Sequence, residues 1–151
     1  MKLTELLRPE HIRVPLAASD KSGVLHELVH LLRVGDPGRQ ERIFGAVLDR
    51  EKIMSTGIGG GVAIPHGKCD AVEGVRASFG VTGAPIDFDS IDGQPVRICF
   101  MIVSEPHTTG PHIRVLAQIS SLLNRPECKE ALVNAASAEE VLEIFARWES
   151  D

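Results

Sequence analysis

The stretch VRICFMIV at residues 96–103 decides the fold, because seven of its eight side chains are apolar. A half-buried strand would alternate apolar and polar residues, whereas this run is apolar almost throughout. Such a run is typical of a central strand that is buried on both faces of a sheet. Its length fits a strand and falls far short of the ~20 apolar residues that a transmembrane helix needs.

Further strand and helix signals lie on either side of this run. Ser19 or Asp20 can cap one helix, and Asp36 followed by Pro37 is a start signal for the next. Residues 55–61 are too rich in glycine to hold a regular element. Strands are expected at about residues 12–16, 62–64 and 75–81, and helices at about residues 4–7, 20–33, 36–50, 111–123, 127–135 and 137–148. This order predicts an α/β sandwich, formed by residues 1–151 as a single domain.

Composition and charge exclude several classes of function. The chain is 43% hydrophobic and 25% charged, as is ordinary for a soluble globule, and it has a net charge of −5 without any Lys or Arg run. It therefore lacks the clustered basic surface that binding to nucleic acid or to anionic lipid requires. The three cysteines, at positions 69, 99 and 128, form neither a disulfide framework nor a zinc-ligand spacing. With no signal peptide and no membrane-length apolar stretch, we expect a cytoplasmic protein without membrane insertion.

The richest segment for chemistry is REKIMSTGIGGGVAIPHGK at residues 50–68. Its five glycines would permit close approach of a backbone or a phosphate to bare N–H groups. The fixed φ of Pro65 stiffens the chain before His66, and Gly67 adds little bulk after it. We therefore expect the imidazole of His66 to be held firmly and to be accessible to a reacting molecule.

Two helix positions add polar groups to this imidazole. Arg50 continues an apolar stripe with positions 43 and 47, and His112 starts another stripe with positions 116, 119 and 123. Both should lie at the rim of the core, and a helix N-terminus favours an anion. A neutral imidazole flanked by such groups could accept a phosphoryl group, a reaction that needs mainly positioning and electrostatic stabilisation. The residues alone leave open that the glycines form only a turn and that His66 is only a polar surface residue.

At these residues the sequence resembles a known family, the IIA proteins of the phosphoenolpyruvate-dependent phosphotransferase system, in the fructose/mannitol class. The segment STGIGGGVAIPHGK is very similar to that of the nitrogen-regulatory type. The resemblance covers nearly the whole chain and includes the segments LTELLRPEHI, DFDSIDGQPV and HIRVLAQISSLL. It implies a mixed β-sheet covered by helices on both faces.

The resemblance also implies roles for individual residues. His66 would be phosphorylated on Nε2, with Arg50 and His112 supporting the phosphoryl group. The loop at the site would be shaped by Ser55, Thr56, Gly59, Gly60, Gly61 and Gly67. Gly60 stands where relatives often carry Asn, so one side-chain hydrogen bond could be lost. The implied donor is a small HPr-like phosphocarrier protein, and no metal or cofactor is required.

The family divides into two functional branches. Sugar-type members pass the phosphoryl group to a cysteine of a IIB component, whereas nitrogen-type members mostly regulate targets such as potassium transport and nitrogen metabolism. No fused IIB, IIC or HPr segment is visible in this sequence, which favours the regulatory type. Two alternatives remain open: a separately encoded sugar-type IIA, and a pure regulatory binding module that phosphorylation switches.

One competing motif is HELVH at residues 26–30, which matches the HExxH signature of zinc proteases. The helical wheel places Leu25 and Leu28 on the apolar face and His26, His30 and Arg33 opposite, toward solvent. A third His at the spacing of the related metzincins is missing. We therefore predict no zinc site here. Elsewhere, Met54 and Ile58 could form an apolar docking rim around His66 or could simply pack in the core.

Overall fold

The computed structural model describes residues 2–149 and is built around a six-stranded mixed sheet. Its strands are β1 (Ile12–Leu16), β2 (Gly57–Gly59), β3 (Val62–Ala63), β4 (His66–Lys68), β5 (Val75–Ile86) and β6 (Val96–Ser104). They are ordered β1-β5-β6-β3-β2, and β4 also pairs with β6. β5 and β6 are antiparallel, whereas β1 runs parallel to β5 and both β3 and β4 run parallel to β6.

The predicted central strand is confirmed as β6, which lies in the middle of the sheet. Because successive side chains of a strand point to opposite faces, the apolar run contributes to two separate hydrophobic clusters. One cluster receives Ile98, Phe100 and Ile102, and the other receives Cys99, Met101 and Val103. The near-continuous apolar sequence of β6 thus reflects burial on both sides.

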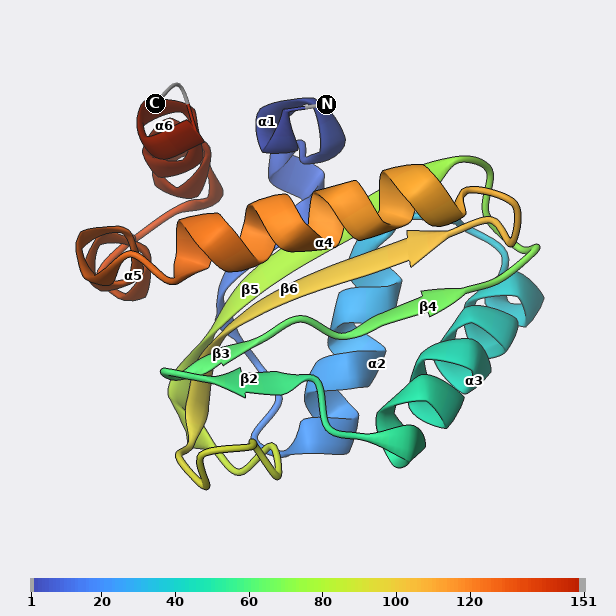
Figure 1. The fold of residues 1–151 in the computed structure, drawn as a ribbon, viewed down its shortest axis with the longest axis horizontal. Coiled ribbons are helices and arrows are strands. Elements are labelled where there is room, and N and C mark those ends of the chain that lie inside the picture. Colours follow the sequence, from blue (N-terminus) through green and yellow to red (C-terminus); the bar gives the residue numbers. More distant parts are fainter. Residues whose placement is uncertain (1, 150–151) are drawn as a thin grey trace.

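Helices cover both faces of this sheet, which confirms the α/β fold class (Figure 1). Helices α2 (Lys21–Leu31) and α3 (Pro37–Ile53) pack on one face. The other face carries α1 (Leu3–Leu6), α4 (Thr109–Leu123), α5 (Pro126–Val133) and α6 (Ala138–Glu149), with a 3-10 turn at Pro9–His11 before β1. The predicted N-caps are confirmed, since Asp20 accepts a hydrogen bond from Gly23 N at 2.7 Å and Asp36 from Gly38 N at 2.9 Å. Within residues 2–149, none of the helices has the length and apolar character required to cross a membrane.

The expectation that residues 55–61 contain no regular element is wrong, because Gly57–Gly59 forms strand β2. β2 pairs with β3 as a hairpin whose turn has φ values of +98°, +66° and +81° at Gly59, Gly60 and Gly61. Glycine adopts this left-handed backbone without strain. A Cβ at Gly57 would lie 2.2 Å from Ser90 Oγ, so only glycine fits there. The glycines therefore serve a tight hairpin.

Strand β4 is also absent from the sequence-based expectations. It follows β3 along the same edge of β6, with Val62 paired to Ile98 and His66 paired to Ile102. Pro65 separates the two short strands, although its carbonyl still accepts a bond from Ile102 N at 3.0 Å. The central strand therefore fixes the backbone at His66.

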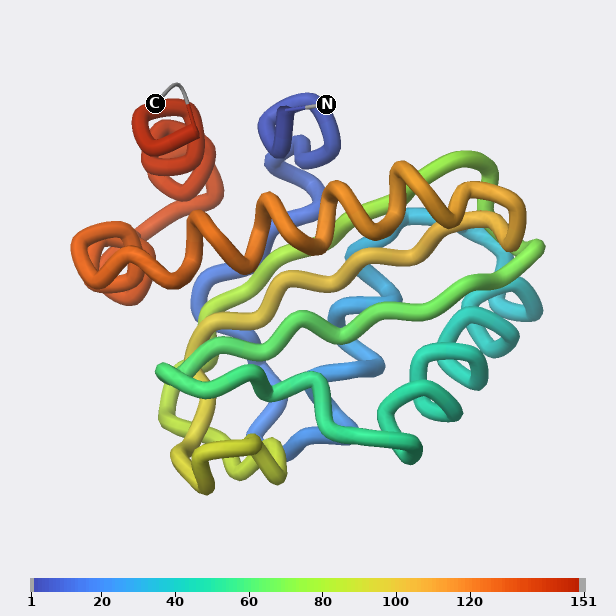
Figure 2. Tube along the Cα trace, viewed as in Figure 1, coloured from blue at the N-terminus to red at the C-terminus, as the bar shows by residue number. Residues whose placement is uncertain are grey.

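Helices α1 and α6, the first and last of the chain, both pack on the sheet face that carries α4 (Figure 2). The Glu149 carboxylate accepts hydrogen bonds from Leu3 N at 2.7 Å, Thr4 N at 3.1 Å and Thr4 Oγ1 at 2.6 Å. The last turn of α6 thereby satisfies backbone donors of α1 that have no partner within that short helix.

Candidate functional site

His66 is half-buried at the start of β4, and its ring is anchored by one backbone group. The Nδ1 atom lies 2.7 Å from the carbonyl oxygen of Ile64. A carbonyl can only accept, so the ring must donate from Nδ1, and in the neutral imidazole the lone pair is then on Nε2. Ile64 is itself held by a 3.0 Å bond from its N–H to the carbonyl of Thr56. The Ile64 carbonyl thus sets the tautomer of His66, and the segment that follows α3 holds Ile64 in place.

Gly67 lets helix α3 approach the strand that carries His66. A Cβ at this position would lie 3.3–3.4 Å from backbone atoms of Ala46 and Val47 in α3. Because side chains alternate along a strand, the side chains of His66 and Lys68 point away from α3. The sequence-based expectation that Gly67 reduces bulk is therefore refined: the space it leaves is filled by the helix.

Arg50 lies in the last turns of α3 and is half-buried, as the rim position predicted. Its Nη1 donates to the carbonyl of Met54 at 2.7 Å, which satisfies a backbone acceptor at the helix end. The pKa of His66 is lowered from its ordinary value, chiefly because burial disfavours the charged ring, and the Arg50 charge adds to this effect. His66 is therefore neutral at pH 7, as a nucleophile requires.

His112, in the first turns of α4, brings a second imidazole to His66. The two ring centroids are 5.7 Å apart with an interplanar angle of 62°. His112 is only 4% exposed, and its Nδ1 lies 2.5 Å from the hydroxyl of Ser104 at the end of β6. Burial lowers the pKa of His112 to about 4, with smaller contributions from His66 and Lys68. His112 is therefore also neutral near pH 7.

Lys68 places an ammonium group at the same site. It shares a strand face with His66, and its Nζ donates to Thr109 Oγ1 at 2.7 Å at the start of α4. The Lys68 charge lowers the pKa of His112, so the two side chains interact. The structure thus gathers His66, Arg50 and His112 as expected and adds Lys68 to them.

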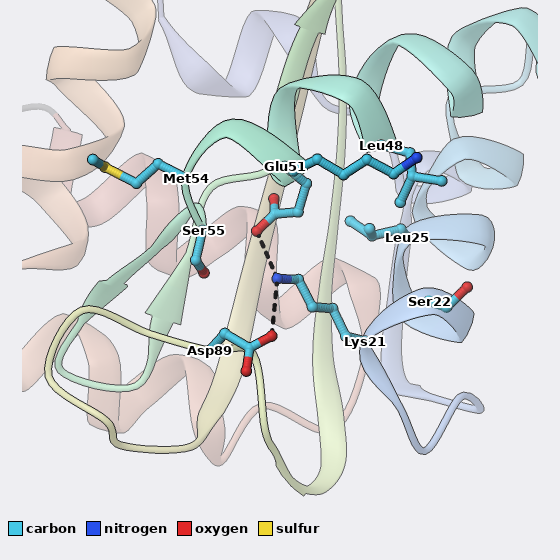
Figure 3. Close-up of a pocket in the computed structure, with 9 residues that line it drawn as sticks. Lys21, Ser22, Leu25, Leu48, Glu51, Met54, Ser55 and Asp89 are labelled. Carbon is cyan, nitrogen blue, oxygen red and sulfur yellow. Dashed lines mark ion pairs between the residues drawn. The ribbon is translucent and has the colours of Figure 1, made fainter.

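The side chains of Ser55 and Thr56 hydrogen-bond to groups other than the imidazole of His66. Thr56 donates from N and Oγ1 to the buried carboxylate of Glu51, at 2.8 and 2.6 Å, and Ser55 Oγ donates to the carbonyl of Phe88 at 2.6 Å. Lys21 Nζ bridges Glu51 at 3.0 Å and Asp89 at 3.6 Å (Figure 3). The Lys21, Glu51, Ser55 and Asp89 side chains line a cavity of about 510 Å³ between α2 and the end of α3. The Ser55 and Thr56 side chains are therefore held by buried partners, and their expected part in shaping the loop beside His66 stays a prediction.

The glycines at 59, 60 and 61 lie at the opposite end of the edge strands from His66. Arg97 N donates to Gly61 O at 3.0 Å, whereas His66 pairs with Ile102. Five residues along β6 correspond to roughly 16 Å. Gly60 N donates to Asp92 Oδ2 at 3.0 Å, so its N–H is not offered to a phosphate. Strand register thus separates the hairpin from the imidazole, and the expected part of Gly59, Gly60 and Gly61 in shaping the loop at the site stays a prediction.

The HELVH motif lies on the solvent side of α2, as the helical wheel predicted. His26 and His30 are exposed, and the His26 ring stacks on Phe44 with centroids 3.6 Å apart. Among residues 2–149, no group of three or more His, Cys, Asp or Glu side chains is arranged to hold a metal ion.

The arrangement suits one kind of chemistry. Nε2 of His66 is a neutral nucleophilic nitrogen. Two cationic side chains lie near it: Arg50 comes from the end of α3, and Lys68 comes from the same strand face as His66. Cations so placed stabilise negative charge on the oxygens of an arriving group. The site is therefore suited to hold a phosphoryl group on nitrogen.

Comparison with known proteins gives the same assignment for the fold. The family described as phosphoenolpyruvate-dependent sugar phosphotransferase system, EIIA 2, matches residues 5–148. The chain belongs to this family.

Relatives from both functional branches are found. A nitrogen regulatory protein of Bradyrhizobium diazoefficiens is 33% identical over 97% of this chain and 95% of its own length. The fructose-specific EIIABC component of Bacillus subtilis is 35% identical over 96% of this chain, which spans only 23% of that longer protein. The crystal structure of nitrogen regulatory protein IIA-Ntr from Neisseria meningitidis superposes with a TM-score of 0.88 at 33% identity, over 95% of this chain and 98% of that one.

Three contributors to the site were missed at the sequence level. The Ile64 carbonyl carries no side-chain signal at all. Lys68 would have followed from strand alternation if β4 had been predicted. Ser104 could not be found from spacing, because its contact with His112 depends on how the turn after β6 leads into α4.

Proposed function

We propose that the protein is a phosphocarrier that accepts a phosphoryl group on Nε2 of His66 from an HPr-like protein. The observation that carries this proposal is the bond between Nδ1 and the Ile64 carbonyl, which leaves Nε2 with the lone pair. The lowered pKa of His66 supports it, because the ring stays unprotonated at pH 7. Membership of the EIIA 2 family supports the phosphotransfer role.

In the proposed reaction the bond between phosphorus and a nitrogen of the donor histidine breaks as a bond to His66 Nε2 forms. The donor ring keeps the electron pair of the broken bond, and the proton of His66 stays on Nδ1, which donates it in a hydrogen bond to the Ile64 carbonyl. Arg50 has five N–H donors, and those besides the one on Met54 O would contact the phosphoryl oxygens. His112 would donate from the other side. Catalysis then rests on positioning and charge stabilisation.

Transfer can be tested with phosphoenolpyruvate, enzyme I and an HPr-like carrier, followed by intact mass. We expect a gain of one acid-labile phosphoryl group that His66→Ala abolishes. His30→Ala is the matched control, since His30 is exposed on α2, and it should be phosphorylated like the wild type. A phosphorylated His66→Ala protein, or no mass gain with any carrier, would refute the proposal.

We infer further that the protein works in the nitrogen-regulatory branch in the cytoplasm, and that residues 1–151 form one EIIA type-2 domain. The IIA-Ntr structure and the Bradyrhizobium relative support this branch. The fructose-specific relative supports the sugar branch as second candidate, with a IIB component as acceptor. Separate assays with nitrogen-type and sugar-type carriers decide between them, because faster transfer from the sugar-type carrier would favour the second.

The role of phosphorylation in regulation is a separate question. A phosphoryl group adds about two negative charges to a docking surface, so phosphorylation could act by switching partner affinity alone. If the His66→Ala variant still controls its targets, the protein acts as a pure binding module. If this variant no longer passes a phosphoryl group to an acceptor protein, the carrier role is favoured.

A further inference from the structure

The Ser104 hydroxyl is fully buried at the end of β6 and lies 2.5 Å from Nδ1 of His112. Ser104 pairs through its backbone with Lys68 of β4 and Val75 of β5, so strands hold it on both sides. Its position relative to the start of α4 is therefore fixed by the sheet, not by a flexible loop.

The chemistry of a hydroxyl decides the direction of this hydrogen bond. If Nδ1 of His112 donated, the Ser104 oxygen would accept and its own proton would need another acceptor. Within residues 2–149, the structure gives that hydroxyl no partner other than His112. A buried donor without a partner is costly, so the arrangement in which Ser104 donates and Nδ1 accepts is favoured.

We propose that Ser104 is a positioning residue that holds neutral His112 with its proton on Nε2, so that this N–H can donate to a group bound at His66. This inference rests on the proposed function for its consequence in phosphoryl transfer. The wrong tautomer would present a lone pair to the oxygens of the phosphoryl group and would repel them. The low pKa of His112 makes the choice matter, because a protonated ring would donate from both nitrogens in any case.

The two histidines are then set to opposite tautomers by opposite partners. A carbonyl, which only accepts, leaves the Nε2 lone pair of His66 free to react. A hydroxyl, which can donate, leaves the Nε2–H of His112 free to stabilise the product. The two neutral imidazoles, 5.7 Å apart, thereby serve as nucleophile and donor without any net charge on either.

The first test needs no variant. Nitrogen-15 NMR spectra of the unphosphorylated protein near pH 7 distinguish a protonated from a bare ring nitrogen. We expect His112 to be protonated on Nε2 and His66 on Nδ1. A His112 ring protonated on Nδ1 would overturn the proposal.

The second test uses Ser104→Ala with Ser78→Ala as its matched control. Ser78 is equally buried on the adjacent strand β5, but its hydroxyl donates to Leu28 O at 2.7 Å, on the α2 face. Ser104→Ala should shift His112 toward the Nδ1-protonated form and slow phosphorylation by roughly tenfold or more, the effect of one charge-assisted hydrogen bond. Ser78→Ala should leave the tautomer unchanged. If the two variants had the same His112 tautomer and the same rate of phosphorylation, the role assigned to Ser104 would be contradicted.

A double-mutant cycle separates positioning from general damage. If Ser104 acts through His112, Ser104→Ala should cause no further slowing when His112 is already Ala. An additional loss of similar size would show that Ser104 acts by another route. If no carrier phosphorylates His66, the proposed function fails, yet the tautomer of His112 still tests this inference by itself.

Discussion

At the scale of single residues, the site depends on two imidazoles that burial keeps neutral. Desolvation is the main reason that the pKa values of both His66 and His112 are lowered. Nearby positive charges from Arg50 and Lys68 act in the same direction. In the proposed function these cations would attract the phosphoryl oxygens, and Arg50 also helps to keep the His66 ring unprotonated.

Neutral His112 should make stability depend on pH. The folded-state pKa of about 4 lies below the ordinary value of 6.5, so the unfolded chain binds this proton more readily. The stability from neutral His112 is fully present above pH 6.5 and is lost as pH falls toward 4. His112→Gln should remove up to about 3 kcal/mol of the difference in unfolding free energy between pH 7 and pH 4. Chemical denaturation at several pH values measures this difference.

The control for that experiment is His30→Gln, because His30 is exposed on α2. It should keep the pH dependence of the wild type. If His112→Gln also kept it, His112 would not be the group whose proton is coupled to folding.

At the scale of elements, the packing of α3 on β4 brings the cation and the nucleophile together. Arg50 is near the end of α3 and His66 opens β4, and the contact between these elements passes over the bare backbone of Gly67. The atoms opposite Gly67 belong to the helix backbone, so they cannot move aside as a flexible side chain could. The distance from helix to strand is therefore sensitive to a single methyl group.

Gly67→Ala should separate α3 from β4 by a few tenths of an ångström and lower the unfolding free energy by about 1–2 kcal/mol. Gly45→Ala is the matched control, because Gly45 lies inside α3 with nothing within 4 Å of its would-be Cβ. It should stabilise the protein by about 0.5–1 kcal/mol through better helix propensity. Urea unfolding measures both, and a stabilising Gly67→Ala would contradict the packing argument.

At the scale of the whole molecule, the sheet separates two hydrophobic cores, and the chain ends close one of them. Residues from α1 and α6 belong to the core on the α4 face, including Leu3 and Phe145, both fully buried. Glu149 ties the last helix to the first through three hydrogen bonds. The ends therefore support the same face on which α4 presents His112.

Glu149→Ala should leave the N–H groups of Leu3 and Thr4 without these partners and lower the unfolding free energy by about 1–2 kcal/mol. Amide hydrogen exchange in α1 should become faster, because local opening no longer breaks the bonds to Glu149. Glu139→Ala, in the exposed first turn of the same helix, should change stability by only a few tenths of a kcal/mol. Equal effects of the two substitutions would show that the hydrogen bonds from Leu3 and Thr4 to Glu149 contribute nothing to stability.

Much of the architecture was predictable from local patterns. The apolar run of β6 indicated burial on both faces, and Asp20 and Asp36 marked helix starts, because these signals act between residues only a few positions apart. The segment around His66 was predicted to be the reactive one, and the structure places His112 and Lys68 beside it. The hairpin that its glycines form was missed, because composition does not reveal which backbone conformations a hairpin needs.

The sequence by itself therefore determined the fold class and the central strand, since both follow from hydrophobic periodicity, and its short motif around His66 predicted the reactive imidazole. Only the tertiary structure decided that β4 runs beside β6, that Gly67 faces α3, and that Ser104 meets His112. These contacts depend on sheet register and on helix docking, where one residue's shift changes every partner. Ser104 and His112 share no local sequence pattern, so their contact became visible only in the tertiary structure.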